Sequence, residues 1–222
     1  MTRLIFLFGI TLALIPGTLL AQPDARQFGV AMGKNQEALR DYTWQSRTEV
    51  TVDGQTNKVD LYQMRYNLDG ELEKTRLGGD AKQKREVRGV LRKRVAKKKK
   101  REAGEFAEAV KLQLQNYMAP NTLQNALSNA FMRRADGTIM LRSQDVVVQG
   151  DSMEFELAEE TRQPTSMRIS TFVEKEPVNV TVDFQRLPDG PNYPARQVIE
   201  SAFGKKKLEI TTENFNYQVQ SR

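Results

Sequence analysis

The C-terminal part of the chain alternates apolar and polar residues along most of its length. Val178, Val180, Val182 and Phe184 form the clearest period-two run. Similar runs recur between residues 138 and 219: they begin with Ile139 and Leu141, continue with Val146–Val148, 153–157 and 167–173, and end near 193–203 and 207–218. Because successive side chains of a strand point to opposite faces, such a run gives the strand one apolar face. We therefore expect about six antiparallel strands here, each with one face in the core and one in water.

Residues 42–79 carry a second block of this pattern. The block is rich in Thr, Val and Tyr, and the pairs Asp53-Gly54 and Asp69-Gly70 stand where hairpin turns are expected. We predict three antiparallel strands, near 43–53, 57–68 and 71–77. On the first of them, Trp44, Val50 and Val52 share one face.

Two helical patterns come before and after this block. Residues 24–40 predict an N-terminal helix with a broad apolar face. A long helical pattern starts after Gly79 and runs to Met118, where Pro120 ends it because the residue before a proline disfavours the helical conformation.

A further helix is expected directly after Pro120, so that two helices stand together in the middle of the chain. Asn121 and Gln124 are its expected caps, and Arg133-Arg134 suit its C-terminal end. Its expected apolar stripe consists of Leu123, Leu127 and Phe131. Together these elements predict one α+β domain over residues 22–222.

The first 21 residues predict an export signal. Arg3 supplies a positive charge, residues 4–15 are continuously apolar, and Pro16-Gly17 interrupts the run before the small residue Ala21. A membrane-spanning helix needs about 20 apolar residues without such a break, and an uncleaved anchor is the alternative. We expect cleavage near Ala21 and a soluble periplasmic protein. No cysteine follows the apolar run, which excludes lipid attachment to a new N-terminal cysteine.

Cysteine and histidine are both absent from the 222 residues. Disulfides, thiol nucleophiles, Cys/His zinc sites and imidazole bases are therefore excluded, and only carboxylate or Ser/Lys chemistry is left to an enzyme. The sequence also lacks a glycine-rich phosphate loop and the spacing of a calcium loop. We expect a protein that is not an enzyme and has no metal and no cofactor.

The net charge of +6 comes from one segment. Residues 82–101 hold twelve Lys or Arg against Glu86, so the rest of the mature chain is acidic. In the basic helical segment 82–118, five consecutive basic residues occupy every side of the helix and leave it no face to bury. These five are Lys97, Lys98, Lys99, Lys100 and Arg101.

Two roles for this basic run remain open. It is either a solvated helical arm or a contact with an anionic membrane surface or acidic partner, where each Lys or Arg contributes about 1 kcal/mol near an anionic leaflet. We expect no nucleic-acid partner, because no aromatic residue stands among the lysines to stack on bases and an export signal leads the protein away from nucleic acid.

Four stretches carry a resemblance to a known family: YTWQSRTEVTVDGQ (42–55), LYQMRYNLDGE (61–71), LPDGPNYPARQVI (187–199) and KKLEITTENFNY (206–217). With the order of the elements, they make the chain resemble the periplasmic lipoprotein-carrier superfamily of LolA and LolB. The resemblance implies a strongly curved antiparallel sheet, an unclosed or half β-barrel, whose concave side is covered by helices and holds acyl chains. The basic segment and the missing lipobox cysteine depart from that pattern.

Two functions follow as hypotheses. In the first, a non-enzymatic exported protein shelters a lipid or a lipoprotein acyl chain on the apolar face of its sheet. The residues expected to line or underlie that face are Trp44, Val50, Val52, Val180, Val182 and Phe184. In the second, residues 97–101 dock on an anionic membrane or an acidic partner, and the sheet is only a scaffold. The sequence leaves the oligomeric state open.

Overall fold

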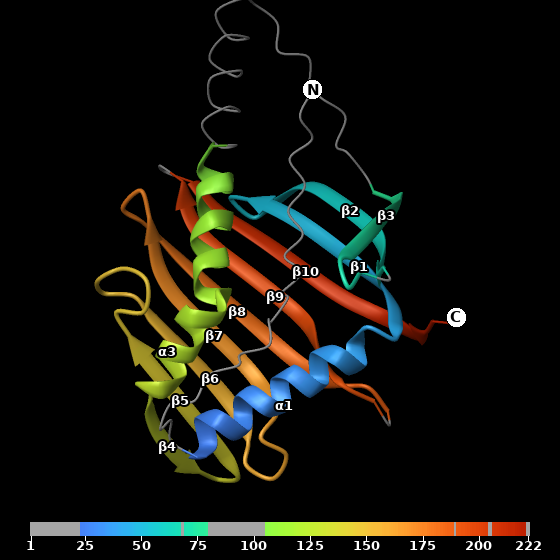
Figure 1. Ribbon diagram of the computed structural model, residues 1–222. Coiled ribbons are helices and arrows are strands. Elements are labelled where there is room, and N and C mark those ends of the chain that lie inside the picture. Colours follow the sequence, from blue (N-terminus) through green and yellow to red (C-terminus); the bar gives the residue numbers. More distant parts are fainter. Residues whose placement is uncertain (1–22, 68, 80–104, 189, 204–205, 221–222) are drawn as a thin grey trace, which may run out of the picture.

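The computed structural model describes residues 23–67, 69–79, 105–188, 190–203 and 206–220 (Figure 1). Ten strands form one antiparallel sheet in the order β3-β2-β1-β10-β9-β8-β7-β6-β5-β4. The strands are β1 (Tyr42–Val52), β2 (Gln55–Tyr66), β3 (Leu72–Gly78), β4 (Phe131–Ala135), β5 (Thr138–Gln144), β6 (Ser152–Ala158), β7 (Pro164–Val173), β8 (Glu176–Arg186), β9 (Asn192–Phe203) and β10 (Lys206–Val219).

Three helices accompany the sheet in the described part of the chain. They are α1 (Pro23–Leu39), a helix over residues 105–118, and α3 (Pro120–Ser128). Ala119 between the last two is extended, with φ −61° and ψ 135°, as expected of a residue before proline. The expected helix end at Met118 is therefore confirmed.

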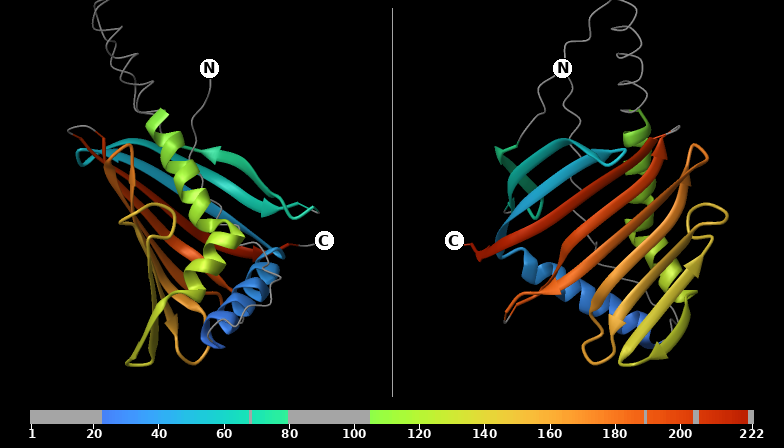
Figure 2. Two further views of the ribbon diagram at one scale, coloured as in Figure 1. Left: turned by 60° about the vertical axis from the view of Figure 1, so that its left-hand side comes forward. Right: turned by 180° about the vertical axis from the view of Figure 1, so that it is seen from behind.

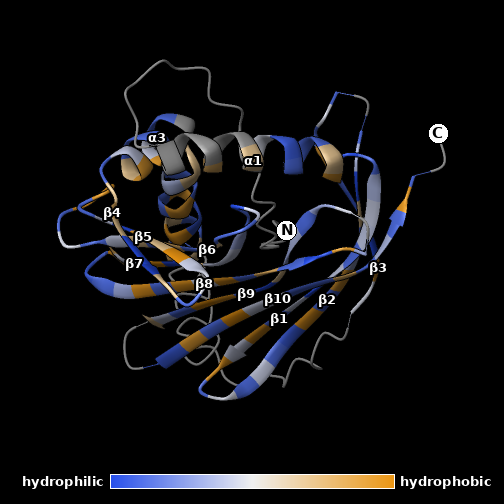
Figure 3. Ribbon diagram, turned by 90° about the horizontal axis from the view of Figure 1, so that it is seen from below, coloured by the Kyte–Doolittle hydropathy of each residue, from blue (hydrophilic) through white to orange (hydrophobic). Residues whose placement is uncertain are grey.

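The sheet is curved and unclosed, because β3 and β4 at its two ends do not pair with each other. Viewed from below, the strands form an arc, and α1 and α3 lie along its open side (Figure 3). The helix 105–118 runs across the same side, over the strands between α3 and the β9–β10 end (Figure 2). We call the side of the sheet that faces the helices the inner face.

The main core lies between the helices and the inner face of β5–β10. Helix 105–118 contributes Phe106, Val110, Leu114 and Tyr117, at the three- and four-residue spacing of one helix face. Strands β5–β8 contribute alternate residues, as the period-two pattern predicted, and β9 and β10 contribute Ile199 and Ile210. The α+β class and the curved antiparallel sheet therefore agree with the expectation from the sequence.

Tight turns join the first two strands where the sequence predicted. Asp53 and Gly54 link β1 to β2 with φ of 51° and 73°. Positive φ at both positions matches the two-residue turns that suit the twist of a hairpin. Asp136 and Gly137 repeat the same two values between β4 and β5.

The predicted extent of the third helix is wrong. Helix α3 has Ala119 rather than Asn121 at its N-cap, and it ends at Ser128 with Asn129 as C-cap. Phe131 and Arg133-Arg134 belong to β4, which pairs with β5 through the Asp136-Gly137 hairpin. Phe131 is 74% exposed and is not part of an apolar stripe. A helical period of four and a short edge strand are both compatible with these residues, and the pairing with β5 decides between them.

The expected strand at Val146–Val148 is also wrong. Strand β5 ends at Gln144, and residues 145–148 form a bend. Their backbone N–H groups donate to a side chain instead of a neighbouring strand, as described below. The export signal predicted over residues 1–21 and the basic residues between 82 and 104 lie outside the described residues. Within the described part of the chain, no helix is long and apolar enough to cross a membrane.

Candidate functional site

The inner face of β1, β2 and β10 carries a surface distinct from the main core. Residues facing each other across β1 and β2 are Trp44 and Met64, Ser46 and Tyr62, Thr48 and Asp60, and Val50 and Lys58. Paired residues of an antiparallel ladder share one face. Val50 packs against the main core, so the whole row lies on the inner face.

An aromatic cluster lies at one end of this row. It consists of buried Trp44, Tyr62 and Met64, with Tyr66, Leu72 and Tyr217 packed against them. The rings of Trp44 and Tyr217 stack with centroids 5.4 Å apart and planes 6° apart, and Tyr66 lies 5.6 Å from Trp44. All six residues come from strands and none from a described helix, which separates this cluster from the helix-covered main core.

The tyrosines of the cluster are in an apolar environment. Burial raises the pKa of Tyr217, and the nearby Tyr193 and Tyr66 raise it further. Burial likewise raises the pKa of Tyr66. Both hydroxyls therefore stay protonated at neutral pH, and the cluster is uncharged.

A polar belt separates the aromatic cluster from the main core. It consists of Ser46, Thr48, Asp60 and Thr212, all of them buried. Thr48 and Thr212 form a hydrogen bond between their Oγ1 atoms at 3.2 Å. Among the described residues, the fully buried Oγ of Ser46 has no hydrogen-bond partner. A buried hydroxyl without a partner is rare.

Asp60 is the charged member of the polar belt. Its carboxylate pairs with Arg76 of β3 through Nη2 and Oδ1 at 3.0 Å, and with Lys58 of the same strand. The Asp60 side chain is 5% exposed, whereas those of Lys58 and Arg76 are 36% and 41% exposed. The carboxylate is thus enclosed, while its two cations reach solvent.

The structure divides the six residues predicted to line the apolar face. Val180, Val182 and Phe184 of β8 lie in or against the main core, beneath the helices. Val50 packs against the same core. Val52, at the end of β1, is half-buried and belongs to neither the main core nor the aromatic cluster. Trp44 alone belongs to the aromatic cluster. A lining role for any of the six stays a prediction, and Lys97–Arg101 lie outside the described residues.

The sequence analysis missed several residues of this surface. Tyr217 lies far from Trp44 in the chain and reaches it through the pairing of β1 with β10. The alternation of polar and apolar residues in β2 and β3 could be seen in the sequence. Only the register of the strands shows that Lys58, Asp60 and Arg76 lie on the apolar side of the sheet. The one signal in the sequence was the position of Asp60, which alternates with Tyr62 and Met64 and so shares their face of β2.

A second buried polar network joins helix 105–118 to the sheet. Tyr117 is fully buried, its hydroxyl donates to Asp151, and it lies 2.7 Å from Oγ1 of Thr171. The Asp151 carboxylate also accepts the backbone N–H groups of residues 146, 147 and 148 at 2.6, 2.9 and 2.8 Å. The Tyr117 hydroxyl and both oxygens of Asp151 have partners within the protein, so the role of this network is structural. The described residues contain no group of acidic side chains placed to hold a metal ion.

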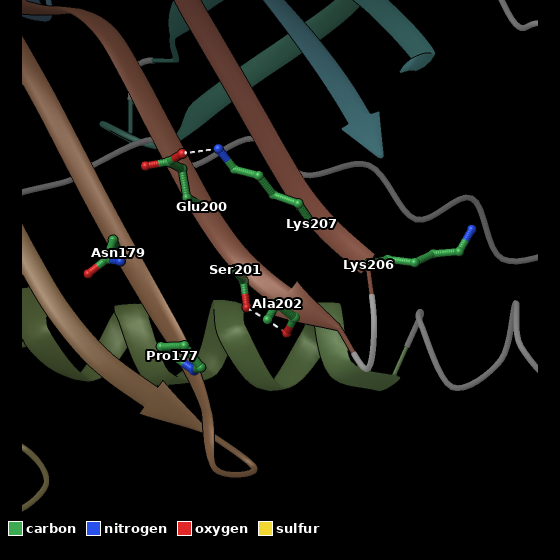
Figure 4. A pocket seen from close by; sticks show the side chains of 7 residues that line it. All are labelled: Pro177, Asn179, Glu200, Ser201, Ala202, Lys206 and Lys207. Carbon is green, nitrogen blue, oxygen red and sulfur yellow. Dashed lines mark hydrogen bonds and ion pairs between the residues drawn. The ribbon is translucent and has the colours of Figure 1, made fainter. Parts of the chain in front are cut away.

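A shallow groove of about 400 Å³ lies at the end of β8–β10 (Figure 4). Pro177, Asn179, Glu200, Ser201, Ala202, Lys206 and Lys207 line it. Lys207 Nζ lies 2.8 Å from Glu200 Oε1 and 3.9 Å from Glu209 Oε2, which compensates its charge within the protein. We assign no ligand to this groove, and the inner face of β1–β3 and β10 is the candidate site.

Comparison with known proteins gives matches only among solved structures. No family model and no curated protein sequence matches the chain. A LolA superfamily protein is among its structural neighbours. That protein, from Nitrosomonas europaea, is 10% identical, with a TM-score of 0.39 over 87% of this chain and 93% of its own.

Two further structures are similar at comparable distance. A DUF1329 family protein from Desulfovibrio piger is 8% identical, with a TM-score of 0.35 over 89% of this chain and 93% of that one. A chain of the MucA/MucB complex from Pseudomonas aeruginosa is 10% identical, with a TM-score of 0.26 over 90% of this chain and 100% of its own. These similarities are all distant, and the function proposed below rests on the candidate site itself.

Proposed function

We propose that this chain is an exported, non-enzymatic binding protein of the periplasm that shelters a lipid or lipoprotein acyl chain on the inner face of its sheet. The observation that carries the proposal is the aromatic cluster. It places Trp44, Tyr62 and Met64 inside the curve of the sheet, apart from the core that the helices fill.

The chemistry of the cluster suits an acyl chain. Its members are large and apolar, and the partly exposed Tyr66, Leu72 and Tyr217 lie at its border, where a chain can contact them. Each CH₂ group removed from water contributes about 0.8 kcal/mol. An acyl chain that buries four or five of its CH₂ groups against this surface would gain about 3–4 kcal/mol. Contacts with Val50, at the edge of the main core, would add to this.

The single tryptophan makes the proposal directly testable. Because Trp44 is the only tryptophan of the chain, its fluorescence reports on the cluster alone. A fatty acid brominated along its chain quenches tryptophan on contact. We expect saturable quenching of Trp44, together with lipid that co-purifies from the native host and is identified by mass spectrometry.

A matched pair of variants on β3 controls for nonspecific effects. Leu72 packs against the cluster, whereas Leu77 is 50% exposed and lies outside it. Leu72→Gln should weaken binding of the probe about tenfold, the effect of losing part of a buried leucine contact, and Leu77→Gln should leave it unchanged. If a folded protein shows neither quenching nor bound lipid, the carrier function is wrong.

The basic run favours a second function, contact with an anionic membrane. This proposal rests on the sequence, since residues 82–101 hold twelve basic residues against one acidic residue. Replacing Lys97–Lys100 with Gln should reduce sedimentation with anionic liposomes, and the effect should fade as salt rises. Binding that is unchanged by the substitution and insensitive to salt would eliminate this role.

A further inference from the structure

Four charged residues of the inner face lie together on β2 and β3. The inner-facing residues of β1 are Trp44, Ser46, Thr48, Val50 and Val52, and those in the middle of β10 are Leu208, Ile210, Thr212 and Asn214, all of them uncharged. Lys206, at the start of β10, has the same parity, and its Nζ lies 3.9 Å from Asp53 Oδ2. On β2 and β3 the same face carries Lys58, Asp60, Lys74 and Arg76. The part of the wall formed by β1 and by β10 from Leu208 to Asn214 is therefore uncharged, and the wall ends at β2 and β3 in three cations and one carboxylate.

The pairing of the strands establishes which way these side chains point. Lys58 lies opposite Val50, which packs against the main core, and Asp60 lies opposite the buried Thr48. Arg76 lies opposite Tyr62, and Lys74 opposite Met64, both members of the aromatic cluster. The ion pairs of Lys58 and Arg76 with the same carboxylate agree with this placement.

The outer face of the same strands is balanced in charge. Arg65 pairs there with Glu73 at 2.8 Å, and Arg47 pairs with Glu49 at 2.6 Å. The inner face instead has an excess of two positive charges. One cation would be enough to pair with the buried Asp60, so the need to compensate that carboxylate does not explain the other two.

We propose that Lys58, Lys74 and Arg76 bind the anionic group, a carboxylate or a phosphate, of an amphiphile whose acyl chain lies on the aromatic cluster. This inference rests on the proposed lipid-binding function and specifies its ligand class. Arg76 and Lys58 are more than one-third exposed, so each can contact a ligand while it still contacts Asp60. Arginine pairs readily with carboxylate or phosphate oxygens, and the lysines add positive charge beside it.

The chain and the headgroup would then contact neighbouring parts of one wall. Tyr62 lies between Ser46 and Arg76 in a row across β1, β2 and β3. The partly exposed Tyr66 and Leu72 lie opposite each other, and Lys74 follows Leu72 by two residues on the same face of β3. Two residues of a strand span about 7 Å, so an acyl chain on Tyr66 and Leu72 has its anionic end within reach of Lys74.

The test compares two brominated probes with the same acyl chain, a fatty acid and its uncharged glycerol monoester, by quenching of Trp44. We expect the wild type to bind the acid about tenfold more tightly, as for one charge-assisted contact. Arg76→Gln leaves Lys58 to pair with Asp60, so the buried carboxylate keeps a partner and the fold is retained. This variant and Lys74→Gln should each lose most of the preference for the acid, with the affinity for the ester unchanged.

Two further variants complete the design. Arg65→Gln removes a cation from the outer face of β2 and should leave both probes unaffected. Asp60→Asn removes the competing carboxylate and should strengthen binding of the acid only. If inorganic phosphate displaces the acid at equal concentration, the cations bind free anions and the amphiphile proposal is wrong.

The remaining outcomes separate this inference from the function on which it rests. If both probes quench Trp44 with equal affinity, an acyl chain binds but the cations do not recognise its headgroup, and only the inference is wrong. If neither probe quenches Trp44 in a protein with native circular dichroism, the lipid-binding function and the inference both fail.

Discussion

The carboxylate of Asp151 allows the most quantitative prediction about stability. Its Oδ2 atom accepts hydrogen bonds from Tyr117 and from the N–H groups of Val147 and Val148, and its Oδ1 atom accepts from Val146. In Asp151→Asn, one of the two oxygens becomes an NH₂ group. If the amide oxygen keeps the three donors at the Oδ2 position, the NH₂ group faces the N–H of Val146, and two donors oppose each other.

The expected destabilisation follows from these contacts. A hydrogen bond to a charged group contributes about 1.5–3 kcal/mol, roughly twice that of a neutral pair. The substitution removes one such bond and the charge from the other three, so we expect a loss of about 2–4 kcal/mol in the free energy of unfolding at pH 7. Urea unfolding followed by circular dichroism measures it, with linear extrapolation to water.

Two matched variants show whether the network itself is responsible. Asp145→Asn lies in the same loop, but its carboxylate is exposed and accepts one bond, from Gly150 N–H at 2.6 Å, so we expect a change below about 0.5 kcal/mol. Tyr117→Phe removes the hydroxyl that donates to Asp151. Because the two residues share this bond, Asp151→Asn and Tyr117→Phe together should destabilise the fold less than the sum of the single substitutions.

The pH dependence gives an independent check. Burial by itself raises the pKa of Asp151, but hydrogen bonds from Tyr117 and from residues 146–148 lower this pKa by more, so the net shift is downward. A lowered folded-state pKa stabilises the fold above the unfolded pKa of about 3.9, and this stabilisation is lost as pH falls through the folded value. The difference between wild type and Asp151→Asn should thus be full at pH 7 and shrink below about pH 4. A difference under 0.5 kcal/mol at pH 7, or one independent of pH, would refute the reasoning.

Three further predictions concern other parts of the fold. Leu114→Ala in the main core should lower the free energy of unfolding by about 2–5 kcal/mol, whereas Leu112→Ala, 60% exposed on the same helix, should change it little in chemical denaturation. Gly79 has φ +146°, and an added Cβ would lie 2.3 Å from a carbonyl oxygen of β2, so Gly79→Ala should lower the melting temperature by several degrees. Gly78→Ala, with no atom within 4 Å of the added Cβ, should not. Burial raises the pKa of Tyr217, so this residue stabilises the fold fully below the unfolded pKa of about 10 and less above it. Tyr217→Phe should therefore remove a late-titrating phenol from an alkaline absorbance titration.

Much of the strand pattern could be read from the chain itself. Period-two alternation located β1–β3 and β6–β10 to within a few residues, and Asp53-Gly54 marked the first hairpin because its positive φ values favour that pair. The helix end before Pro120 followed from local sterics in the same way. These features depend on residues that are neighbours in sequence, so the sequence by itself determined them.

The composition of the candidate site depended on contacts between distant residues. Alternation showed that Trp44 and Val182 each lie on the apolar face of a strand, but not that helices cover Val182 whereas Trp44 stacks on Tyr217. That difference arises from the strand order, which places β1 beside β10, and from the helices crossing only part of the arc.

The same reason explains the elements that the sequence analysis mistook. Phe131 belongs to a strand because it pairs with β5. Residues 146–148 form no strand, because the Asp151 carboxylate accepts their N–H groups. The cations at the β2–β3 edge likewise face the aromatic cluster only through the register of β1, β2 and β3. A sequence pattern determines which residues share a face of one strand. The tertiary structure decides which residues that face contacts, because strand pairing and helix packing bring together residues that are far apart in the chain.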